Sequence, residues 1–491
     1  MSLNIPSDEI ERLVQQVVER VRNDVSLKPE TPQKTPDTGS AIQSSATAPN
    51  FSAAEGIFDS IDAAVQAANK AYEEYSAVSL YRRKRFLEAM RTAAREHAEV
   101  FAREAVAETG LGKVEDKIQK NLLAANKTPG VEDLAPLAYT GDDGLTLVEP
   151  APFGVIGAVT PSTNPAATVI NNSISIVAAG NAVVFNPHPS AKAVTNHAVA
   201  VINESIRKAG GPSTLLCSTA QPTLKSSQAL MEHAGIRLLL VTGGGLVVSM
   251  AMKSGKRCIA AGPGNPPVIV DDTATITKAA RAIVDGASFD NNILCTAEKE
   301  IFAFDSIADQ LMSEMVGYGA YRATGDEINK LVDALVEPGQ PHPHPKRQYV
   351  GKDASTLLQA AGITPSREVK LVICETDFDH PLVHAEMLMP IVPVVRVKDL
   401  QEALEKAKLA EHGNRHSAYM HSESVSNMSL VARRIETTIF VKNAPSYAGL
   451  GFGGEGYCTL SIAGPTGEGL TSARSFTRQR RCVLAGAFRI I

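Results

Sequence analysis

The strongest constraint on the fold is a regular alternation of predicted strands and helices along most of the chain. After helical stretches that fill residues 60–127, strand-like apolar segments recur near residues 155–160, 182–186, 215–218 and 238–241, with helical segments between them. Helical crossovers of this kind join parallel strands in a right-handed sense, so the sequence predicts a doubly wound α/β sheet. Ligands of such sheets bind at the carboxyl ends of the strands.

A second block of alternating segments begins at residues 267–270 and runs to about residue 441. A chain of 491 residues is too long for one hydrophobic core, so we expect it to divide into two or three domains. The second block therefore predicts another α/β domain. The cleft between the two blocks is where a ligand site is expected.

Two segments, 139–154 and 478–491, fit neither block, and both have the pattern of extended strands. A strand that finds no partner within its own domain tends to join the sheet of a neighbouring chain. The sequence therefore predicts a homo-oligomer, either a dimer or a tetramer.

The amino-terminal segment predicts a separate element. Apolar residues recur at three- and four-residue steps along residues 7–22, which is typical of an amphipathic helix, and Ser7 is suited to cap it. Residues 26–50 are rich in Pro, Ser, Thr and Gln, as in a flexible linker. The apolar stripe either docks on a partner protein or folds back onto its own domain or an oligomer partner.

Bulk properties argue against several functions. Lys and Arg number 48 against 53 Asp and Glu, a net charge of -5, which offers no basic surface for nucleic acid. No window is long and apolar enough for a membrane helix. The six cysteines lie far apart, which favours a reducing cytoplasm over a disulfide framework. His342 and His344, in PGQPHPHPK, fit an exposed turn better than a metal site.

Cys295 is the first candidate for chemistry. The run GASFDNNILCTAEKE (286–300) places this lone thiol in a polar loop just ahead of a predicted strand. A thiolate is a strong nucleophile, and catalytic groups are concentrated on loops held by a rigid scaffold. The alternative is a buried, unreactive cysteine, because free Cys is among the most buried residue types.

Two strand ends carry further candidates. VTGGG (241–245) closes a strand and opens a helix, so its backbone N–H groups could face a diphosphate, although a plain tight turn has the same pattern. In VTPSTNP (159–165), Asn164 follows a strand and precedes Pro165, which suits the first turn of a helix. The Asn164 amide could donate to an oxyanion or cap that helix, and the pattern alone favours neither.

Taken together, these motifs resemble those of the aldehyde dehydrogenase superfamily. GASFDNNILCTAEKE, VTPSTNPAATVINN, VTGGG, GPGNPP and AEMLMPIVPVVRV occur in the order that the superfamily uses, over roughly residues 55–491. The sequence is most similar to the CoA-acylating branch, which includes the propionaldehyde and acetaldehyde dehydrogenases of bacterial microcompartments.

The resemblance implies a role for each matching residue. Cys295 matches the nucleophile, and Asn164 matches the oxyanion-hole asparagine. Further residues match the positions that bind the nicotinamide cofactor: Thr160, Pro161 and Thr163 on the nicotinamide side, Thr242, Gly243, Gly244 and Gly245 at the diphosphate, and Glu386 and Leu388 at the nicotinamide riboside. A carboxylate such as Glu386 can accept hydrogen bonds from ribose hydroxyls, and the alternative is an ordinary surface acid. No metal ligand is implied.

The resemblance also implies an aldehyde dehydrogenase-like α/β fold. Its expected parts are a Rossmann-type NAD-binding domain (55–135 and 154–263), an α/β catalytic domain (264–472) and a β oligomerisation arm (136–153 and 473–491). Residues 1–24 resemble a targeting helix that binds microcompartment shell proteins, and residues 25–54 would be its flexible linker. The expected location is therefore the lumen of a bacterial microcompartment in the cytoplasm.

One departure from the superfamily bears on the reaction. Hydrolysing members carry a water-activating glutamate where this chain has Ala260, in IAAGPGNPP. A thioester on Cys295 would then hydrolyse slowly, whereas the thiol of CoA could attack it without help. The expected reaction is oxidation of a short-chain aldehyde, propionaldehyde or acetaldehyde, to its acyl-CoA. The alternatives are a hydrolysing enzyme that forms the free acid, with another side chain as base, and a non-catalytic microcompartment scaffold protein.

A second departure concerns the cofactor. Asn186 and Pro189 replace the lysine and the glutamate that many members use on the adenine ribose. NAD is expected rather than NADP because the nearest basic side chain, Lys192, lies further on, in the next predicted helix. CoA is expected to enter by the same route after the reduced cofactor leaves.

Overall fold

The computed structural model describes residues 51–339 and 341–491. The predicted targeting helix and most of its predicted linker lie outside these residues. The first described part is helical, as the sequence predicts: α2 (Ile61–Ser76), α3 (Leu80–Glu96), α4 (Ala98–Thr109) and α5 (Val114–Lys127) follow one another. Ser60 caps α2 by accepting a hydrogen bond from Ala63 N, and α4 ends at Gly110, which has a positive φ of 67°.

The first sheet has six parallel strands in the order β1-β6-β5-β4-β7-β8. These are β1 (Ile57–Phe58), β4 (Val155–Val159), β5 (Ala182–Asn186), β6 (Leu216–Thr219), β7 (Ile236–Thr242) and β8 (Cys258–Ala261). The four strands predicted first are confirmed. The chain leaves β4 toward β5 and β6 and then returns to the other side of β4 with β7, so the strand order reverses between β4 and β7. This reversal is where a doubly wound sheet binds its ligand.

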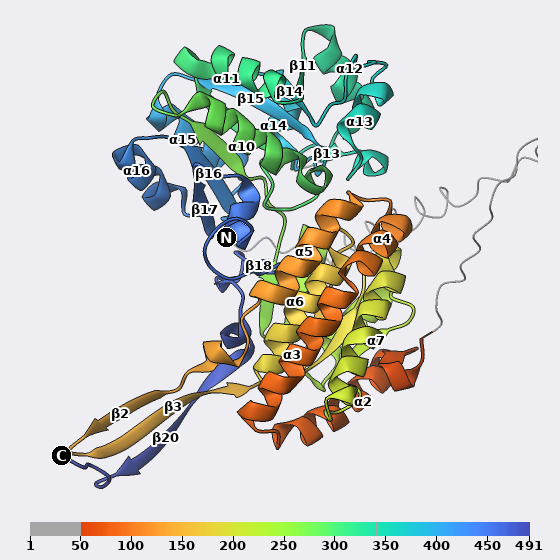
Figure 1. Cartoon of the computed structure of the whole chain (residues 1–491), viewed down its shortest axis with the longest axis vertical. Coiled ribbons are helices and arrows are strands. Elements are labelled where there is room, and N and C mark those ends of the chain that lie inside the picture. Colours follow the sequence, from red (N-terminus) through yellow and green to blue (C-terminus); the bar gives the residue numbers. More distant parts are fainter. Residues whose placement is uncertain (1–50, 340) are drawn as a thin grey trace, which may run out of the picture. The chain divides into compact units, whose positions relative to one another are not determined.

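Helices cover the first sheet in two groups. Helices α6 (Pro165–Ala178) and α7 (Lys192–Lys208) pack with α3, and α5 contacts α3 and α6. Helix α8 (Leu224–Glu232) contacts α2, and both pack on β4 and β5, whereas α9 (Gly245–Lys253) packs on β7 and β8. The orange and yellow helices at the lower right of Figure 1 belong to this domain. Its strands β4 and β5 are buried throughout, as expected for a sheet that helices cover on both faces.

The second sheet has seven parallel strands in the order β11-β14-β15-β10-β9-β16-β17, which confirms a second α/β block (Figure 1). They are β9 (Pro267–Val270), β10 (Glu300–Phe304), β11 (Ala320–Ala323), β14 (Leu371–Glu375), β15 (Ile391–Val397), β16 (Ser417–His421) and β17 (Ile439–Lys442). The connecting helices are α10 (Ile276–Ser288), α11 (Asp305–Gly317), α12 (Asp326–Leu335), α13 (Ala354–Ala360), α14 (Pro381–His384), α15 (Leu400–Ala410) and α16 (Val425–Ile435).

The candidate residues of this second block precede its strands rather than follow them. Cys295 comes just before β10, and Glu386 comes before β15. The carboxyl-end rule that applies to the first sheet therefore does not apply to the second. Strands β15, β10, β9 and β16 are consecutive neighbours, so the segments that enter them lie side by side at the amino edge of the sheet.

The two predicted extended segments lie in one antiparallel sheet, in the order β2-β3-β20 (Figure 1). Its strands are β2 (Leu137–Gly141), β3 (Gly144–Pro152) and β20 (Thr477–Ala485), and β2 and β20 are mostly exposed. Residues 473–476, which were assigned to the arm, instead form the short helix η7 (Ala473–Phe476) with Phe476 fully buried. Pairing of this arm with another copy stays a prediction.

The end of the second domain also differs from the expected boundary at residue 472. After β17 and the short helix η6 (Ser446–Leu450), apolar side chains including Leu460, Ile462 and Phe476 join the core of the first domain. A hairpin of β18 (Ile462–Ala463) and β19 (Gly469–Leu470) lies here, and β18 contacts β8. The chain thus returns to the first domain about twenty residues early, because its apolar residues pack beside the edge strand β8 rather than on the completed second sheet.

A smaller difference concerns residues 338–346, predicted as an exposed turn. They connect β12 (Val336–Glu337) to β13 (His344–Pro345), which pair as a short antiparallel ladder. The His342 ring stacks on His412 with ring centroids 3.6 Å apart, so only part of the segment faces solvent. Among the described helices, none is both long and apolar enough to span a membrane.

We predict that Phe476→Ala destabilises the first domain by about 3–5 kcal/mol, because it empties a fully buried aromatic site in that core. The midpoint of urea unfolding would measure the loss. Leu409→Ala is the matched control, since Leu409 is 63% exposed on α15 and its truncation should change the unfolding free energy by no more than about 0.5 kcal/mol. Equal midpoints for the two variants would contradict the assignment of residues 451–476 to the first core.

Candidate active site

The loop that carries Cys295 is held in an unusual backbone conformation. Between the end of α10 and Cys295, three consecutive residues have positive φ: Asp290 at 48°, Asn291 at 54° and Asn292 at 60°. Asp and Asn tolerate this region better than other side chains, yet each such residue costs on the order of 1–3 kcal/mol unless its surroundings enforce it. Strong local contacts must therefore hold the loop.

Some of these contacts come from the strained residues themselves. Asn291 Nδ2 donates to Gly351 O at 2.9 Å, and Asn292 Nδ2 donates to Ala287 O at 2.8 Å and to Glu298 O at 3.0 Å. These bonds tie the turn to α10 before it and to the entry of β10 after it. The asparagine side chains thus replace the hydrogen bonds that regular secondary structure would supply.

A buried lysine closes the loop around Cys295. Lys299 Nζ lies within hydrogen-bond distance of four acceptors: Asn292 Oδ1 at 2.7 Å, Leu294 O at 2.9 Å, Asn292 O at 3.2 Å and Ala297 O at 3.3 Å. Since these acceptors lie on both sides of residue 295, the ammonium group fixes the path of the chain through the nucleophile. Burial lowers the pKa of Lys299 to about 8, and Glu386 opposes this shift.

Cys295 itself is partly buried. Burial raises the pKa of its thiol to about 12, the charge of Glu386 adds to the rise, and the charges of Lys299 and Lys120 oppose it. The thiol is therefore protonated at neutral pH in the protein without ligands. Because the thiolate is the nucleophilic form, attack requires that a base remove this proton.

Asn164 lies at the carboxyl end of β4, directly before Pro165 in the first turn of α6. In the described structure its side chain does not cap α6, which removes one of the two interpretations of the sequence. Instead, Asn164 Oδ1 accepts a hydrogen bond from Lys120 Nζ, and Asn164 Nδ2 donates to Thr163 Oγ1 at 3.3 Å. The amide is thus held by side chains rather than by the helix end, and a role at an oxyanion stays a prediction.

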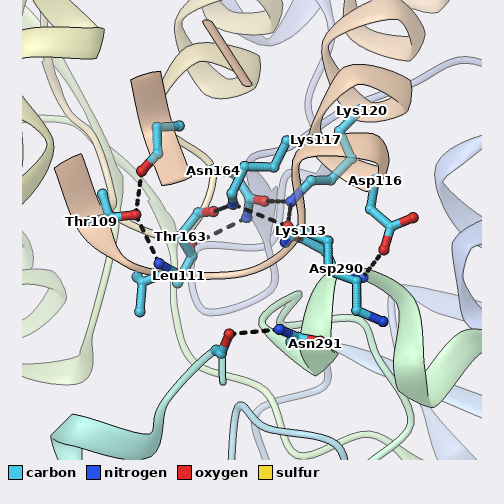
Figure 2. A network of polar contacts seen from close by, with 12 residues as sticks. Thr109, Leu111, Lys113, Asp116, Lys117, Lys120, Thr163, Asn164, Asp290 and Asn291 are labelled. Carbon is cyan, nitrogen blue, oxygen red and sulfur yellow. Dashed lines mark hydrogen bonds and ion pairs between the residues drawn. The ribbon is translucent and has the colours of Figure 1, made fainter. Parts of the chain in front are cut away.

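Figure 2 shows the polar network around Asn164. Asp290 Oδ2 pairs with the ammonium groups of both Lys117 and Lys120, and Asp290 Oδ1 accepts from Lys113 N at 2.7 Å. Lys117 Nζ also donates to Thr163 O at 3.0 Å. The carboxylate of the nucleophile loop therefore binds α5, and α5 in turn binds the turn after β4. The structure brings the Cys295 loop and Asn164 into one connected network.

Glu386 and Leu388 lie between α14 and β15. Glu386 Oε1 accepts from Gly264 N at 3.2 Å. Burial raises the pKa of Glu386 to about 7, and Lys299 opposes the rise. Leu388 has a φ of 51°, which is rare for a bulky side chain, and its carbonyl accepts from Gly351 N at 2.9 Å. Glu386 is thus a partly buried carboxyl group whose charge acts on the thiol, and not an ordinary surface acid.

The predicted cofactor residues lie at the two strand ends where the first sheet reverses. Thr160 N donates to Asn186 O at 3.3 Å, and Thr160 Oγ1 is buried with no hydrogen-bond partner within residues 51–339 and 341–491. Pro161 and Thr163 are partly exposed. An orphaned hydroxyl at a partly open strand end fits a polar ligand.

The glycine turn after β7 is open. Thr242 Oγ1 contacts Ser461 Oγ at 2.9 Å, and α9 begins at Gly245 with Gly244 at its cap. A β-carbon added at Gly243, Gly244 or Gly245 would meet no described atom within 4 Å. Gly244 and Gly245 are exposed, so this helix end is open to a diphosphate, whereas Gly243 N already donates to Ala261 O at 3.1 Å. The residues present thus fit a nicotinamide dinucleotide.

The structure also shows what occupies the positions where this chain differs from many members of the superfamily on the adenine side. The Asn186 side chain is buried, donates to Ser227 Oγ at 2.8 Å and accepts from Ser226 Oγ at 2.6 Å. It therefore ties β5 to α8 instead of reaching out to a ligand. Lys192 lies in α7, as predicted, and donates to Gln221 Oε1 at 2.6 Å. Ala260 is fully buried on β8 and offers no titratable group.

The sequence predicts no role for His416, which the structure places at the site. It precedes β16, and a β-carbon added at Gly264 would lie 2.8 Å from Cys295 O and 3.0 Å from His416 Cγ, so Gly264 fills the space between the nucleophile loop and this ring. His416 Nδ1 contacts Ser417 Oγ at 2.7 Å, and Nε2 is buried without a partner in the described part of the chain. Burial and Lys299 lower the pKa of His416 to about 4, which keeps the ring neutral.

Lys117, Lys120, Asp290 and Lys299 were also given no role from the sequence. Lys117 and Lys120 look like two solvated charges of an amphipathic helix, and Asp290 lies 170 residues from its partner Lys120. The placement of α5 on the loop before Cys295 reveals the first three, and the path of the loop around its ammonium group reveals Lys299. His416 lies directly ahead of β16, a position that no sequence pattern singled out.

The fold and site define an α/β enzyme with a loop thiol between a dinucleotide-type sheet and a second α/β domain. Residues 43–477 match the sequence profile described as the aldehyde dehydrogenase family. The chain is 49% identical over 441 residues to the acetylating acetaldehyde dehydrogenase EutE of Salmonella typhimurium. The matched region covers 89% of this chain and 94% of that protein. The chain belongs to the aldehyde dehydrogenase family.

Two solved structures are similar over most of the chain. The propionaldehyde dehydrogenase from the Clostridium phytofermentans fucose utilisation bacterial microcompartment shares 50% identity with a TM-score of 0.87, over 89% of this chain and all of that one. The Rhodopseudomonas palustris propionaldehyde dehydrogenase, solved with bound CoA and an acylated cysteine, shares 47% identity with a TM-score of 0.86 over the same fractions. These likenesses confirm the aldehyde dehydrogenase-like fold.

The pKa shifts predict how Cys295 reacts with iodoacetamide. Labelling of Cys295 should accelerate roughly tenfold per pH unit between pH 7 and 10, because its thiolate fraction grows in that proportion below the raised pKa. Glu386→Gln removes a negative charge that raises the pKa of the thiol, so labelling above pH 7 should be faster than in the wild type. Below pH 7 the two rates should converge, since Glu386 is then protonated. Mass spectrometry of the labelled peptides measures the labelling rate of Cys295 in the wild type and in Glu386→Gln.

Exposed Cys482 on β20 is the internal reference for this experiment, because its labelling should be the same in both proteins. Slower labelling of Cys295 in Glu386→Gln would contradict the assigned electrostatics.

Proposed function

We propose that this protein oxidises a short-chain aldehyde, propionaldehyde or acetaldehyde, to its acyl-CoA with a nicotinamide dinucleotide. The observation that carries the proposal is the shared network that joins the Cys295 loop to Asn164, a nucleophile and an amide donor at facing edges of two sheets. The acylated cysteine and the CoA of the Rhodopseudomonas relative support the same chemistry.

Each site residue would have a defined role in the reaction. The Cys295 thiol first passes its proton to a base, for which the neutral His416 ring is available, and the proton leaves to solvent. The sulfur then adds to the aldehyde carbonyl, and the resulting alkoxide receives hydrogen bonds from Asn164 Nδ2 and Cys295 N. The chemistry supplied by the bound dinucleotide is acceptance of a hydride, which leaves the acyl group on Cys295 as a thioester. Thr160, Pro161, Thr163 and the turn Thr242, Gly243, Gly244 and Gly245 would hold the dinucleotide, together with Glu386 and Leu388.

Transfer to CoA completes the cycle. The CoA sulfur attacks the thioester carbonyl, its proton passes to a base, and Cys295 leaves as thiolate. The neutral His416 ring, with Nε2 unpaired in the described chain, is suited to accept that proton. Product release then regenerates the resting thiol. The order of events is ping-pong, because the aldehyde-derived group rests on the enzyme before CoA attacks.

One observation favours hydrolysis as a second candidate function. Glu386, whose pKa burial raises to about 7, is close enough to raise the pKa of Cys295, and a carboxylate beside a thioester could activate water. Against this, Glu386 matches the riboside-binding position, and position 260, where hydrolysing relatives carry their base, is the apolar Ala260. A scaffold without activity is the third candidate and predicts no NADH with any short aldehyde.

A product assay separates these candidates. With propionaldehyde, NAD and CoA, we expect steady NADH formation and stoichiometric propionyl-CoA; without CoA, we expect only a burst of about one NADH per site. Steady NADH with free propionate, lost in Glu386→Gln, would instead indicate hydrolysis. Spectrophotometry at the NADH absorbance and chromatographic thioester detection measure both products.

Two variants control this assay. Cys295→Ala should abolish NADH formation, and Asn164→Ala should reduce turnover roughly a hundredfold or more, the usual effect of losing one oxyanion donor. Turnover close to wild type in Cys295→Ala would reject the mechanism.

We also propose that the enzyme is a homo-oligomer and resides in the lumen of a microcompartment. The exposed strands β2 and β20 support association through the arm. The apolar periodicity of residues 7–22 and the microcompartment origin of the Clostridium relative support the location. The partner surface would be an apolar groove on a shell protein.

Removal of residues 1–24 tests the location. We expect the truncated protein to keep its kcat with propionaldehyde, because every site residue lies beyond residue 100, and to be lost from purified shells when co-expressed with them. Quantitative immunoblotting of the shell fraction measures the loss. Unchanged co-purification of the truncated protein would contradict the targeting role.

A further inference from the structure

Two lysines of α5 are buried directly beside Asn164 (Figure 2). The side chains of Lys117 and Lys120 are 4% and 3% exposed, and both ammonium groups bind Asp290 Oδ2, whose side chain is fully buried. Asp116 accepts from Asp290 N at 2.7 Å, but burial raises its pKa, which weakens its ability to balance the second lysine. An unbalanced buried charge is strongly unfavourable, so stability alone does not account for a second buried lysine beside Asp290. A role of one of the two lysines in the active site would account for it.

Lys120 dictates the orientation of the Asn164 amide. An ammonium group carries three donors and no acceptor, so the atom of Asn164 that it contacts has to be the carbonyl oxygen. The NH2 group of the amide is therefore turned away from α5, and one of its N–H bonds points to Thr163 Oγ1. The second N–H remains to donate to a ligand. A neutral neighbour such as serine would allow either orientation.

Lys120 also strengthens the donor. Its positive charge on Oδ1 withdraws electron density from the amide, and hydrogen bonds in such a chain reinforce one another. Lys120 also acts on the nucleophile, because its charge is among those that lower the pKa of Cys295. The same ammonium group thus favours negative charge both on the sulfur and on the oxygen that sulfur attack would create.

We propose that Lys120 is a positioning residue for the oxyanion site: it locks Asn164 with its N–H groups toward the substrate and polarises the amide, with Asp290 holding the lysine in place. This proposal rests on the proposed function, since it concerns the alkoxide formed on Cys295. Lys120 acts chiefly through Asn164, because its charge lowers the pKa of Cys295 less than the charge of Lys299 does, so most of its effect should exist only when Asn164 is present.

Lys117 provides a matched control. It lies one turn earlier on α5, is equally buried and pairs with the same oxygen of Asp290. Its remaining hydrogen bond, however, goes to the backbone carbonyl of Thr163 at 3.0 Å and not to the Asn164 side chain. A variant of Lys117 therefore reproduces the loss of a buried ion pair without freeing the Asn164 amide.

The test is a double-mutant cycle read out as the rate of the NADH burst. Lys120→Met should slow the burst roughly tenfold or more, while Asn164→Ala should slow it roughly a hundredfold or more. The double variant should be at most slightly slower than Asn164→Ala alone, because the lysine then keeps only its small charge effect on Cys295 and has no amide left to position. Lys117→Met should lose clearly less burst rate than Lys120→Met, and the KM for NAD should change little in Lys120→Met.

Multiplicative losses in the double variant, or equal losses in Lys117→Met and Lys120→Met, would overturn the proposal and leave Lys120 a structural residue. If Lys120→Met does not fold, the same cycle is run with Lys120→Gln, which keeps a donor without the charge; it should retain more activity than Asn164→Ala and show the same non-additivity. Absence of an NADH burst in the wild type would reject the proposed function instead, whatever the variants show.

Discussion

The buried carboxylate of Asp290 is the contact on which the rest of the site depends. It belongs to the loop that carries Cys295, yet its partners Lys113, Lys117 and Lys120 all belong to α5 or its start in the other domain. Loss of one partner from such a buried ion pair typically costs about 3–5 kcal/mol. This energy is comparable to the backbone cost of three successive residues with positive φ, so the ion cluster can hold the loop in its strained form.

The two sheets contribute opposite ends to the site. The first sheet supplies the carboxyl ends of β4 and β7, where turns expose backbone N–H groups, while the second supplies the amino ends of β9, β10, β15 and β16. A dinucleotide can thus be held by one sheet while reactive side chains approach from the other. Gly264 is required at this junction because a side chain there would collide with the Cys295 carbonyl and the His416 ring.

The sequence predicts the parts of the site that depend on local patterns. The strand and helix alternation identifies both α/β blocks, and the positions of Cys295 and Asn164 at strand borders identify the nucleophile and amide candidates. Lys120 and Asp290 were not found because their meaning arises from a contact across 170 residues. The early return of residues 451–476 to the first core was missed for a similar reason: the local pattern of apolar residues in a Gly- and Ser-rich stretch does not predict which of two cores they join.

The raised pKa of Cys295 has a consequence for the lifetime of the protein. Peroxides and other oxidants attack thiolates, and a sulfur that advances to the sulfinic acid is lost to catalysis. A thiol that stays protonated until a reaction partner arrives is poorly reactive toward these oxidants. The burial that slows the first chemical step therefore also preserves the sulfur of the idle enzyme.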